Sequence, residues 1–182
     1  MSRYYFPKPY ADFVARLRVP SGFLLVVTFA WLSQPDWSSL AFGLPLSVLG
    51  LLLRGWAAGH LAKNQTLTRG GPYAYLRNPL YVGTLAVAAG LVISSRQWPL
   101  AALFAAVFLL VYLPVIELEE QHLRKLFPDY AAYAGAVPAL FPRLTPAPGN
   151  TVFHWALYRK NQEYQALLGF LAGAALLIYK AA

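Results

Sequence analysis

Residues 70–83 read GGPYAYLRNPLYVG and place glycine and polar residues between two long apolar segments. Pro79 can begin a helix, because a helix leaves its first N–H groups unpaired and proline has none. Asn78, directly before it, is a preferred N-cap residue. We therefore predict a loop that ends where an apolar helix begins. Its simplest interpretation is a loop at the membrane interface. Arg77 would then mark the cytoplasmic side, and the tyrosines would lie at the level of the lipid headgroups.

The composition around this stretch indicates a membrane protein. Hydrophobic residues make up 58% of the chain and charged residues 12%, whereas an average soluble domain carries about 25% charged residues. The net charge is +8, but no face combines Lys and Arg with stacking aromatics, so no nucleic-acid partner is expected. The chain has no cysteine, and its three histidines are scattered. Disulfides and a Cys nucleophile are therefore excluded, and no metal site is expected.

The apolar segments predict an all-α fold, a polytopic transmembrane helix bundle of about five spans in a single domain, residues 1–182. A bilayer needs about 20 apolar residues per helix, so the first and last segments are short. Proline at position 114 predicts a kink near the end of the fourth span. The five spans are expected at residues 19–33, 40–58, 79–94, 99–116 and 165–179.

A second polar cluster, IELEEQHLRKLFPDYAAY, occupies residues 116–133. No helix breaker precedes the proline at position 128, so the fourth helix is expected to continue out of the membrane. Glu119 and His122 then share one side of it, while Glu120 faces Arg124 in a favourable i,i+4 pair. The proline-rich segment that follows, residues 129–150, is predicted to pack on the bundle as an ordered extension.

The basic residues set the expected orientation. Thirteen of the 15 Lys and Arg residues fall on one face, and only Arg96 and Lys180 fall opposite. This bias predicts an integral multi-pass protein whose polar clusters face the cytoplasm, in the inner membrane if the source is bacterial. Arg54 is the one ionisable residue well inside apolar sequence. Such residues are functional candidates, here for substrate binding, and snorkelling to lipid phosphates is the alternative.

Taken in order, GGPYAYLRNPLYVG and EEQHLRKLFPDYAAYAGAVPALFP resemble the membrane methyltransferases of the isoprenylcysteine carboxyl methyltransferase and phospholipid methyltransferase superfamily. The family pattern is GxYxxxRHPxYxG followed by EExxLxxxFGxxYxxYxxxVPxxxP, and the resemblance covers residues 51–142. It implies S-adenosyl-L-methionine as cofactor, bound by the cytosolic loop and the C-terminal segment. The implied cofactor-binding residues are Gly70, Gly71, Pro72, Tyr73, Asn78, Pro79, Leu80, Tyr81, Glu119 and Glu120, and the implied catalytic residues are Glu120, Arg77 and Asn78.

These residue types suit the implied chemistry. A carboxylate such as Glu119 complements the ammonium group of the cofactor, Arg77 complements its carboxylate, and tyrosines stack on adenine or face the sulfonium. Methyl transfer from a sulfonium requires alignment and exclusion of water, so neither a catalytic triad nor a metal is needed. The expected partners are a lipophilic, membrane-dissolved acceptor and membrane lipids; the oligomeric state is not specified by the sequence.

Two departures from the family bear on the acceptor. Asn78 stands where the family usually has His, and Val115 stands where prenylcysteine enzymes have Arg, which disfavours a prenylcysteine carboxyl. A phospholipid-like amine needs a base, for which Glu117, Glu120 and His122 are the candidates; an isoprenoid-like carboxyl needs none. Two other functions remain open: a non-catalytic membrane protein that binds nucleotide or lipid, and a small transporter.

Overall fold

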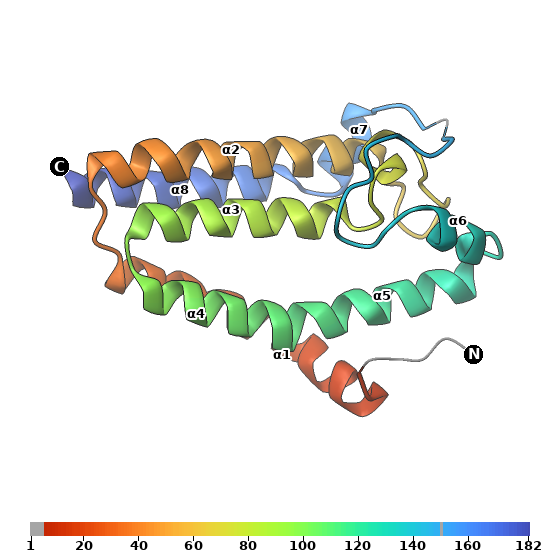
Figure 1. The fold of residues 1–182 in the computed structure, drawn as a ribbon, viewed down its shortest axis with the longest axis horizontal. Coiled ribbons are helices and arrows are strands. Elements are labelled where there is room, and N and C mark those ends of the chain that lie inside the picture. Colours follow the sequence, from red (N-terminus) through yellow and green to blue (C-terminus); the bar gives the residue numbers. More distant parts are fainter. Residues whose placement is uncertain (1–5, 150) are drawn as a thin grey trace.

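The structure, a computed structural model, describes residues 6–149 and 151–182, and this part of the chain is helical without any strand. Figure 1 shows long, roughly parallel helices with the irregular segments gathered at one end. The all-α prediction is confirmed. The elements are α1 (Lys8–Leu32), α2 (Trp37–His60), the short 3₁₀ turn η1 (Gly71–Ala74), α3 (Pro79–Ser95), α4 (Trp98–Val107), the π turn η2 (Phe108–Tyr112), α5 (Leu113–Leu126), α6 (Tyr130–Ala136), α7 (Trp155–Lys160) and α8 (Tyr164–Ala181).

Three helical stretches in the described residues are long and apolar enough to cross a bilayer: α2, the continuous Trp98–Leu126 and α8. A fourth is obtained if α1, which bends by 49° between Lys8–Leu17 and Val19–Leu32, is counted as one span. The apolar helix α3 has 17 residues, which corresponds to about 26 Å of rise. The polytopic bundle is therefore confirmed, with three or four full-length spans in place of about five.

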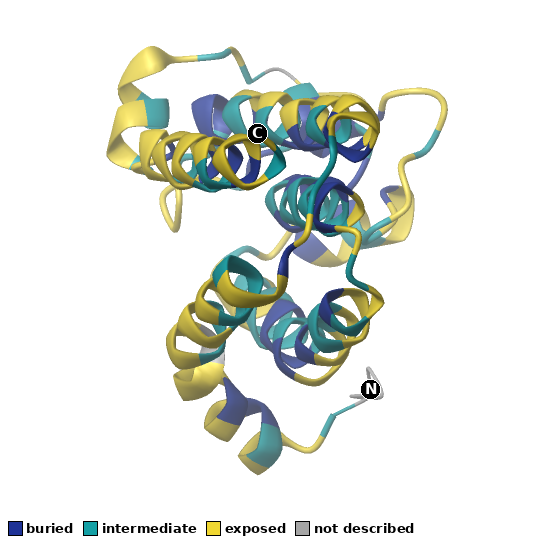
Figure 2. Cartoon of the chain, turned by 90° about the vertical axis from the view of Figure 1, so that its left-hand side faces the viewer, coloured by how far each residue is buried: buried dark blue, intermediate teal, exposed yellow. Residues whose placement is uncertain are grey.

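The outer surface of the bundle is apolar. In the end-on view of Figure 2, exposed residues cover the outward sides of the helices and buried residues lie between them. Large apolar side chains are exposed there, including Phe42 at 77% and Phe23 at 67%. Exposed apolar area of this extent is matched by acyl chains and not by water. The chain is an integral membrane protein.

Close backbone contact joins α2 to α3. A Cβ on Gly50 would lie 2.6 Å from the carbonyl oxygen of Gly83, and a Cβ on Gly90 would lie 2.4 Å from that of Gly43. The fully buried Ser47 hydroxyl donates to a carbonyl of α3 at 2.8 Å. Small residues and interhelical hydrogen bonds are what hold helices together in lipid, where apolar burial gives little drive.

Replacing Gly83 with alanine is expected to destabilise the protein by about 1–3 kcal/mol, because it overpacks this contact. The new Cβ would lie 2.5 Å from Cγ of Arg54 and 2.8 Å from the carbonyl oxygen of Gly50. Thermal unfolding in detergent measures the effect as a lower Tm. Gly22→Ala is the matched control, because nothing lies within 4 Å of its added Cβ and alanine has the higher helix propensity. Equal melting of the two variants would contradict this account.

Near Pro114, where a kink was expected, the fourth span contains the π turn η2. This turn ends at Tyr112, and α5 begins at the next residue. Proline has no N–H, so it cannot donate to the carbonyl of Leu110 four residues earlier. The hydroxyl of Tyr10, on α1, donates to that carbonyl at 2.7 Å. A carbonyl that the proline leaves unpaired thus fastens α1 to the fourth span.

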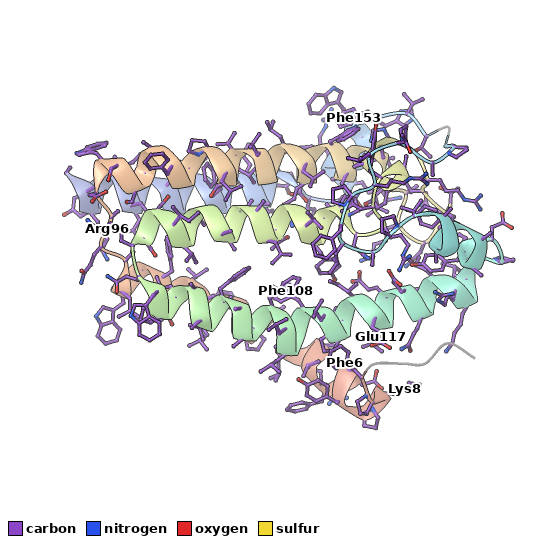
Figure 3. All side chains as sticks on the ribbon, in the orientation of Figure 1. Phe6, Lys8, Arg96, Phe108, Glu117 and Phe153 are labelled. Atoms are coloured by element: carbon purple, nitrogen blue, oxygen red, sulfur yellow. The ribbon has the colours of Figure 1, made fainter. Side chains whose placement is uncertain are left out.

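Charged side chains close the end of the bundle opposite the loops. Asp36 caps α2 by accepting the Ser39 N–H at 2.7 Å, and this bond, with the Ser38 hydroxyl, lowers the pKa of Asp36. Arg96, labelled in Figure 3, pairs with the same carboxylate. Lys180 donates to three carbonyls at the end of α1, those of Ala30, Trp31 and Ser33. The two basic residues that the sequence separated from the others therefore share this end.

The proline-rich segment packs on the loop between α2 and α3, as predicted. Backbone N–H groups of Arg77 and Asn78 donate to the carbonyls of Pro138 and Ala139, at 2.9 and 3.2 Å. Further along, the N–H of Ala147 donates to the carbonyl of Ala74 at 2.9 Å. Buried side chains of α6 and its neighbours, Tyr130, Tyr133, Val137 and Ala147, form a small core beneath these bonds. The two segments hold each other in one conformation.

Candidate functional site

A cavity of about 500 Å³ opens at the loop end of the bundle, within the usual size range of small-molecule sites. Five parts of the chain line it: α2, the α2–α3 loop with the start of α3, η2, the outward half of α5, and α6. Arg54, Thr84 and Tyr112 line its membrane-side part. The remaining lining residues are Leu61, Lys63, Asn64, Thr66, Leu67, Thr68, Tyr73, Arg77, Asn78, Pro79, Leu80, Tyr81, Glu119, His122, Leu123, Phe127, Tyr130 and Tyr133.

Tyr73 of the first polar cluster and Glu119 of the second face this same cavity. Burial raises the pKa of the Tyr73 phenol, and the nearby negative charge of Glu119 adds to the effect. Tyr73 therefore remains a neutral hydroxyl and offers an aromatic face and a hydrogen-bond donor, not a base. Glu119 and His122 line the cavity together, so the predicted continuation of the fourth helix and its polar side are confirmed.

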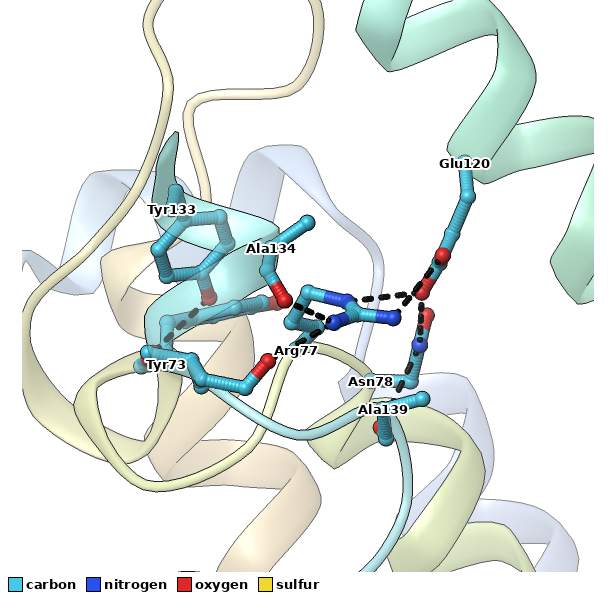
Figure 4. A network of polar contacts seen from close by, with 8 residues as sticks. Tyr73, Arg77, Asn78, Glu120, Tyr133, Ala134 and Ala139 are labelled. Carbon is cyan, nitrogen blue, oxygen red and sulfur yellow. Dashed lines mark hydrogen bonds and ion pairs between the residues drawn. The ribbon is translucent and has the colours of Figure 1, made fainter. Parts of the chain in front are cut away.

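A bidentate ion pair ties the loop to α5 (Figure 4). Nε and Nη2 of Arg77 donate to the two carboxylate oxygens of Glu120 at 2.9 and 3.0 Å. Nη1 donates to the carbonyls of Ala134 and Val137 at 2.8 and 2.7 Å, at the end of α6. Burial alone would lower the pKa of Arg77, but the hydrogen bonds and charge of Glu120 raise it. The guanidinium thus joins three segments that are distant in the sequence.

Asn78 belongs to the same network. Its Nδ2 donates to Glu120 at 3.0 Å and to the carbonyl of Ala139 at 3.3 Å. The prediction that its side chain caps α3 is wrong: Asn78 occupies the N-cap position, but its amide makes no capping hydrogen bond. The two bonds that Nδ2 donates, to the charged Glu120 carboxylate and to the Ala139 carbonyl, fix the orientation of the amide group, so its oxygen does not accept from the first turn of α3.

The expected i,i+4 pair between Glu120 and Arg124 is also replaced. Glu120 is bound by Arg77 and Asn78, and Arg124 lies over the ring of Tyr130 at 5.4 Å. Arg77 and Asn78 line the cavity, whereas Glu120 lies behind them, outside the lining. These three residues, which the resemblance implied to be catalytic, bind chiefly to one another and fix the cavity wall.

Gly70, Gly71 and Pro72 lie behind the wall and do not line the cavity. Gly71 has a positive φ of 57°, and a Cβ there would lie 2.6 Å from the ring of His60. Pro72 is fully buried. The glycine is required by this left-handed turn and by the close approach of the ring. The three residues therefore set the path of the loop that brings Tyr73 to the cavity.

Arg54 turns inward and binds a carboxylate of the chain. Its Nε and Nη2 donate to Glu163 at 2.5 and 2.9 Å. The snorkelling alternative is therefore wrong. Sequence reasoning missed Glu163, although one signal was available: it is the only Asp or Glu after Asp129.

The run from Lys63 to Thr68 was also missed as part of the site, although five of its six residues line the cavity. Asn64 in this run has a positive φ of 60°, a conformation that asparagine adopts more readily than most residues. In the part of the chain that the structure describes, no three His, Asp or Glu side chains gather as metal ligands.

Comparison with known proteins gives one family and two similar sequences. Residues 39–130, half of the chain, match the family model described as phospholipid methyltransferase. The cobalt-zinc-cadmium resistance protein CzcN of Cupriavidus metallidurans is 36% identical over 126 residues, which cover 65% of this chain and 58% of that protein. The nickel-cobalt-cadmium resistance protein NccN of Alcaligenes xylosoxydans xylosoxydans is 34% identical over 152 residues, 76% of this chain and 71% of that protein.

No solved structure matches the chain. The family match includes the loop, α3 and the helix that carries Glu119 and Glu120, and it ends at Tyr130. These are the segments that meet around the cavity. By its matched sequence and by its helical membrane fold, the chain belongs to the phospholipid methyltransferase family.

Proposed function

We propose that this protein is an S-adenosyl-L-methionine-dependent methyltransferase that acts on a lipophilic acceptor held in the membrane. The supporting observation is the single cavity shared by Tyr73 and Glu119, which opens at the loop end and extends to Arg54 and Tyr112 inside the bundle. A water-soluble donor can enter such a cavity from one end and a lipid headgroup can reach the other. Residues at the opposite end of the bundle, such as Asp36 and Arg96, are not part of the lining, which disfavours the transporter alternative.

The lining offers partners for the ammonium, the adenine and the sulfonium of the cofactor, whereas Arg77, expected to complement its carboxylate, is bound by Glu120. The Glu119 carboxylate is suited to an ammonium group. Tyr73, Tyr81 and Tyr130 offer aromatic faces for adenine or for a sulfonium. When bound, S-adenosyl-L-methionine supplies a methyl group already activated by the positive sulfur. The task left to the chain is to align the acceptor with that methyl group and to keep water away from it.

Among the acceptors left open by the sequence, the charges favour an amine. A carboxylate acceptor in the membrane needs a cationic partner, but Arg54 and Arg77 are each paired with a carboxylate of the chain. The remaining Lys or Arg of the lining, Lys63, lies in the α2–α3 loop at the open end of the cavity. Val115, at the position of the prenylcysteine enzymes' arginine, is a buried apolar residue. We therefore propose a phospholipid-like amine as the methyl acceptor.

An amine acceptor must lose a proton as its new N–C bond forms and the S–C bond breaks. Of the three candidate bases, Glu120 is bound by Arg77 and Glu117 accepts the N–H of Phe6 at 3.2 Å. His122 lines the cavity. We propose that an imidazole nitrogen of His122 takes this proton, directly or through a water, and returns it to solvent at the open rim.

The names of the two relatives refer to metal resistance. The chain has no cysteine and, within residues 6–149 and 151–182, no cluster of metal-ligand side chains. We propose that a role of this chain in metal resistance would arise from methylation of a membrane component and not from binding the ion itself.

Titration calorimetry on the purified protein tests the proposal, with S-adenosylhomocysteine, the demethylated product, as ligand. Binding with a Kd in the micromolar range is expected, and the absence of heat with both product and cofactor would remove the enzyme proposal. Methyl-labelled cofactor is then incubated with the protein in vesicles of phosphatidylethanolamine, and label in the lipid amine is expected. A farnesylated cysteine with a free carboxylate serves as the comparison substrate. Label found in this compound and not in the lipid amine would refute the amine acceptor.

A further inference from the structure

An ion pair inside the membrane region lies at the inner part of the cavity. Arg54 lies on α2, six residues before the helix ends at His60, which places it about 9 Å inside the end of the span. Its side chain is 21% exposed and lines the cavity. Ionisable residues at such positions are rare, because their burial is costly, and they commonly mark binding sites.

Four hydrogen bonds fix the guanidinium. Nε and Nη2 bind the two oxygens of Glu163. Nη1 donates to the hydroxyl of Thr84 and, at 3.3 Å, to the carbonyl of Leu80, both on α3. A guanidinium has five N–H groups, so one N–H on Nη2 is left for a further acceptor.

Gly83 provides the space for this arrangement. Because a Cβ there would lie 2.5 Å from Cγ of Arg54, only glycine lets the arginine pass between α2 and α3 toward the cavity. The family motif contains this glycine, and the structure supplies a physical reason for it. The path of the side chain is therefore determined at its stem as well as at its charged end.

Glu163 reaches Arg54 from outside the family-matched segment. It lies directly before α8, 109 residues after Arg54, and its side chain is 7% exposed. It does not line the cavity, so it sits behind the guanidinium. Glu163 can act on a bound molecule only through Arg54, by holding its orientation and cancelling its charge.

Stability alone does not account for such a pair. Desolvating two charges offsets much of their attraction, and well-packed apolar residues of similar volume are often as stabilising or more so. What an apolar pair cannot supply is an oriented N–H on the cavity wall. This difference points to a binding role for the cavity-facing side of Arg54.

We propose that Arg54 is the residue that binds the acceptor's headgroup, and that Glu163 is its positioning residue. This inference rests on the proposed function. The remaining N–H donates to a headgroup oxygen near the methyl acceptor. Because the ion pair is neutral as a whole, the site selects a zwitterionic phospholipid over an anionic one, whose charge would lack a counter-charge there.

The test uses the full-length protein in phosphatidylcholine vesicles that contain phosphatidylethanolamine with a photoreactive acyl chain near the headgroup. Crosslinked peptides are mapped by mass spectrometry. Crosslinks to α3 or η2 beside the cavity are expected in the wild type. Their yield should fall about tenfold in Arg54→Gln and in Glu163→Gln and be largely retained in Glu163→Asp. Photoreactive phosphatidylglycerol should give a several-fold lower yield in the wild type.

The double variant Arg54→Met with Glu163→Leu separates binding from folding. It should melt within a few degrees of the wild type, because the apolar pair replaces the ion pair, yet lose about tenfold in crosslinking. Unchanged crosslinking in this variant would overturn the proposal, and so would the absence of cavity crosslinks in the wild type. A double variant that melts far below the wild type would assign the pair to stability and would also overturn it.

Calorimetry with S-adenosylhomocysteine distinguishes this inference from the proposed function. All four variants should retain the wild-type affinity for that product within about threefold, because Arg54 and Glu163 are proposed to act on the acceptor and Glu119 on the cofactor. If the wild type gives no heat, the methyltransferase proposal fails. If the wild type gives heat but its crosslinks do not depend on Arg54, only the headgroup site fails.

Discussion

Replacing Glu119 with glutamine is expected to weaken the binding of S-adenosylhomocysteine by roughly 10- to 100-fold. A hydrogen bond to a charged group contributes about 1.5–3 kcal/mol, and each 1.4 kcal/mol is about tenfold in Kd. Glutamine keeps the shape of the side chain but loses the charge that complements the ligand's ammonium. Titration calorimetry in detergent measures the loss, and the fold is checked by an unchanged Tm.

Glu117→Gln is the matched control on the same helix. Glu117 accepts the N–H of Phe6 at 3.2 Å, on the side of α5 that faces α1, and it is not part of the cavity lining. Figure 3 shows the two residues beside each other, below the fourth span. The control should bind the product as tightly as the wild type. Equal weakening in both variants would mean that the effect reflects overall charge, and Glu119 would lose its assigned role.

Replacing Arg77 with glutamine is expected to lower the stability of the protein by about 3–5 kcal/mol, the usual effect of removing one partner of a buried ion pair. The side chains of Arg77 and Glu120 are only 13% and 16% exposed, so the remaining carboxylate would be poorly solvated. The carbonyls of Ala134 and Val137 would lose their donor as well. For a chain of this size the Tm should fall by about 6–20 °C.

Arg69→Gln provides the comparison for this measurement. Arg69 pairs with Asp129 at 2.9 Å, but the two side chains are 37% and 76% exposed, so the pair should contribute about 0–1 kcal/mol. Thermal unfolding of the three proteins is followed by circular dichroism in the same detergent. If Arg77→Gln melts like Arg69→Gln, the network around Glu120 does not hold the loop, and the cavity wall must be stabilised in another way.

The positions of the helices and the meeting of the two polar clusters could be predicted from the sequence. Hydropathy depends on each segment alone, so the five apolar stretches could be located to within a few residues at most ends. The largest difference lies at the N-terminus, where the first helix begins at Lys8, ahead of the expected residue 19. Its first part is polar and bends by 49° from the apolar part. A prediction from hydropathy therefore does not include this first part in the span.

The pairing of the site residues could not be predicted, because it depends on tertiary contacts. Asn78 has the sequence context of an N-cap, yet its side-chain amide donates to Glu120, 42 residues later. Arg54 has the context of a snorkelling residue, yet Glu163 turns it inward. The resemblance implied that Gly70 and Gly71 bind the cofactor, whereas Gly71 approaches His60 of the chain itself. In each case a local preference was overridden by a charged or bulky group from a distant segment.

The long separation between Arg54 and Glu163 has a consequence for biogenesis. The carboxylate follows the arginine by 109 residues, which a ribosome adds in about 5–20 s. During that interval α2 must enter the bilayer with an uncompensated charge, or wait at its edge until Glu163 emerges from the ribosome. Assembly of the finished bundle therefore waits for the synthesis of Glu163, and the nascent chain depends on the insertion machinery to shelter the charge of Arg54 until this carboxylate arrives.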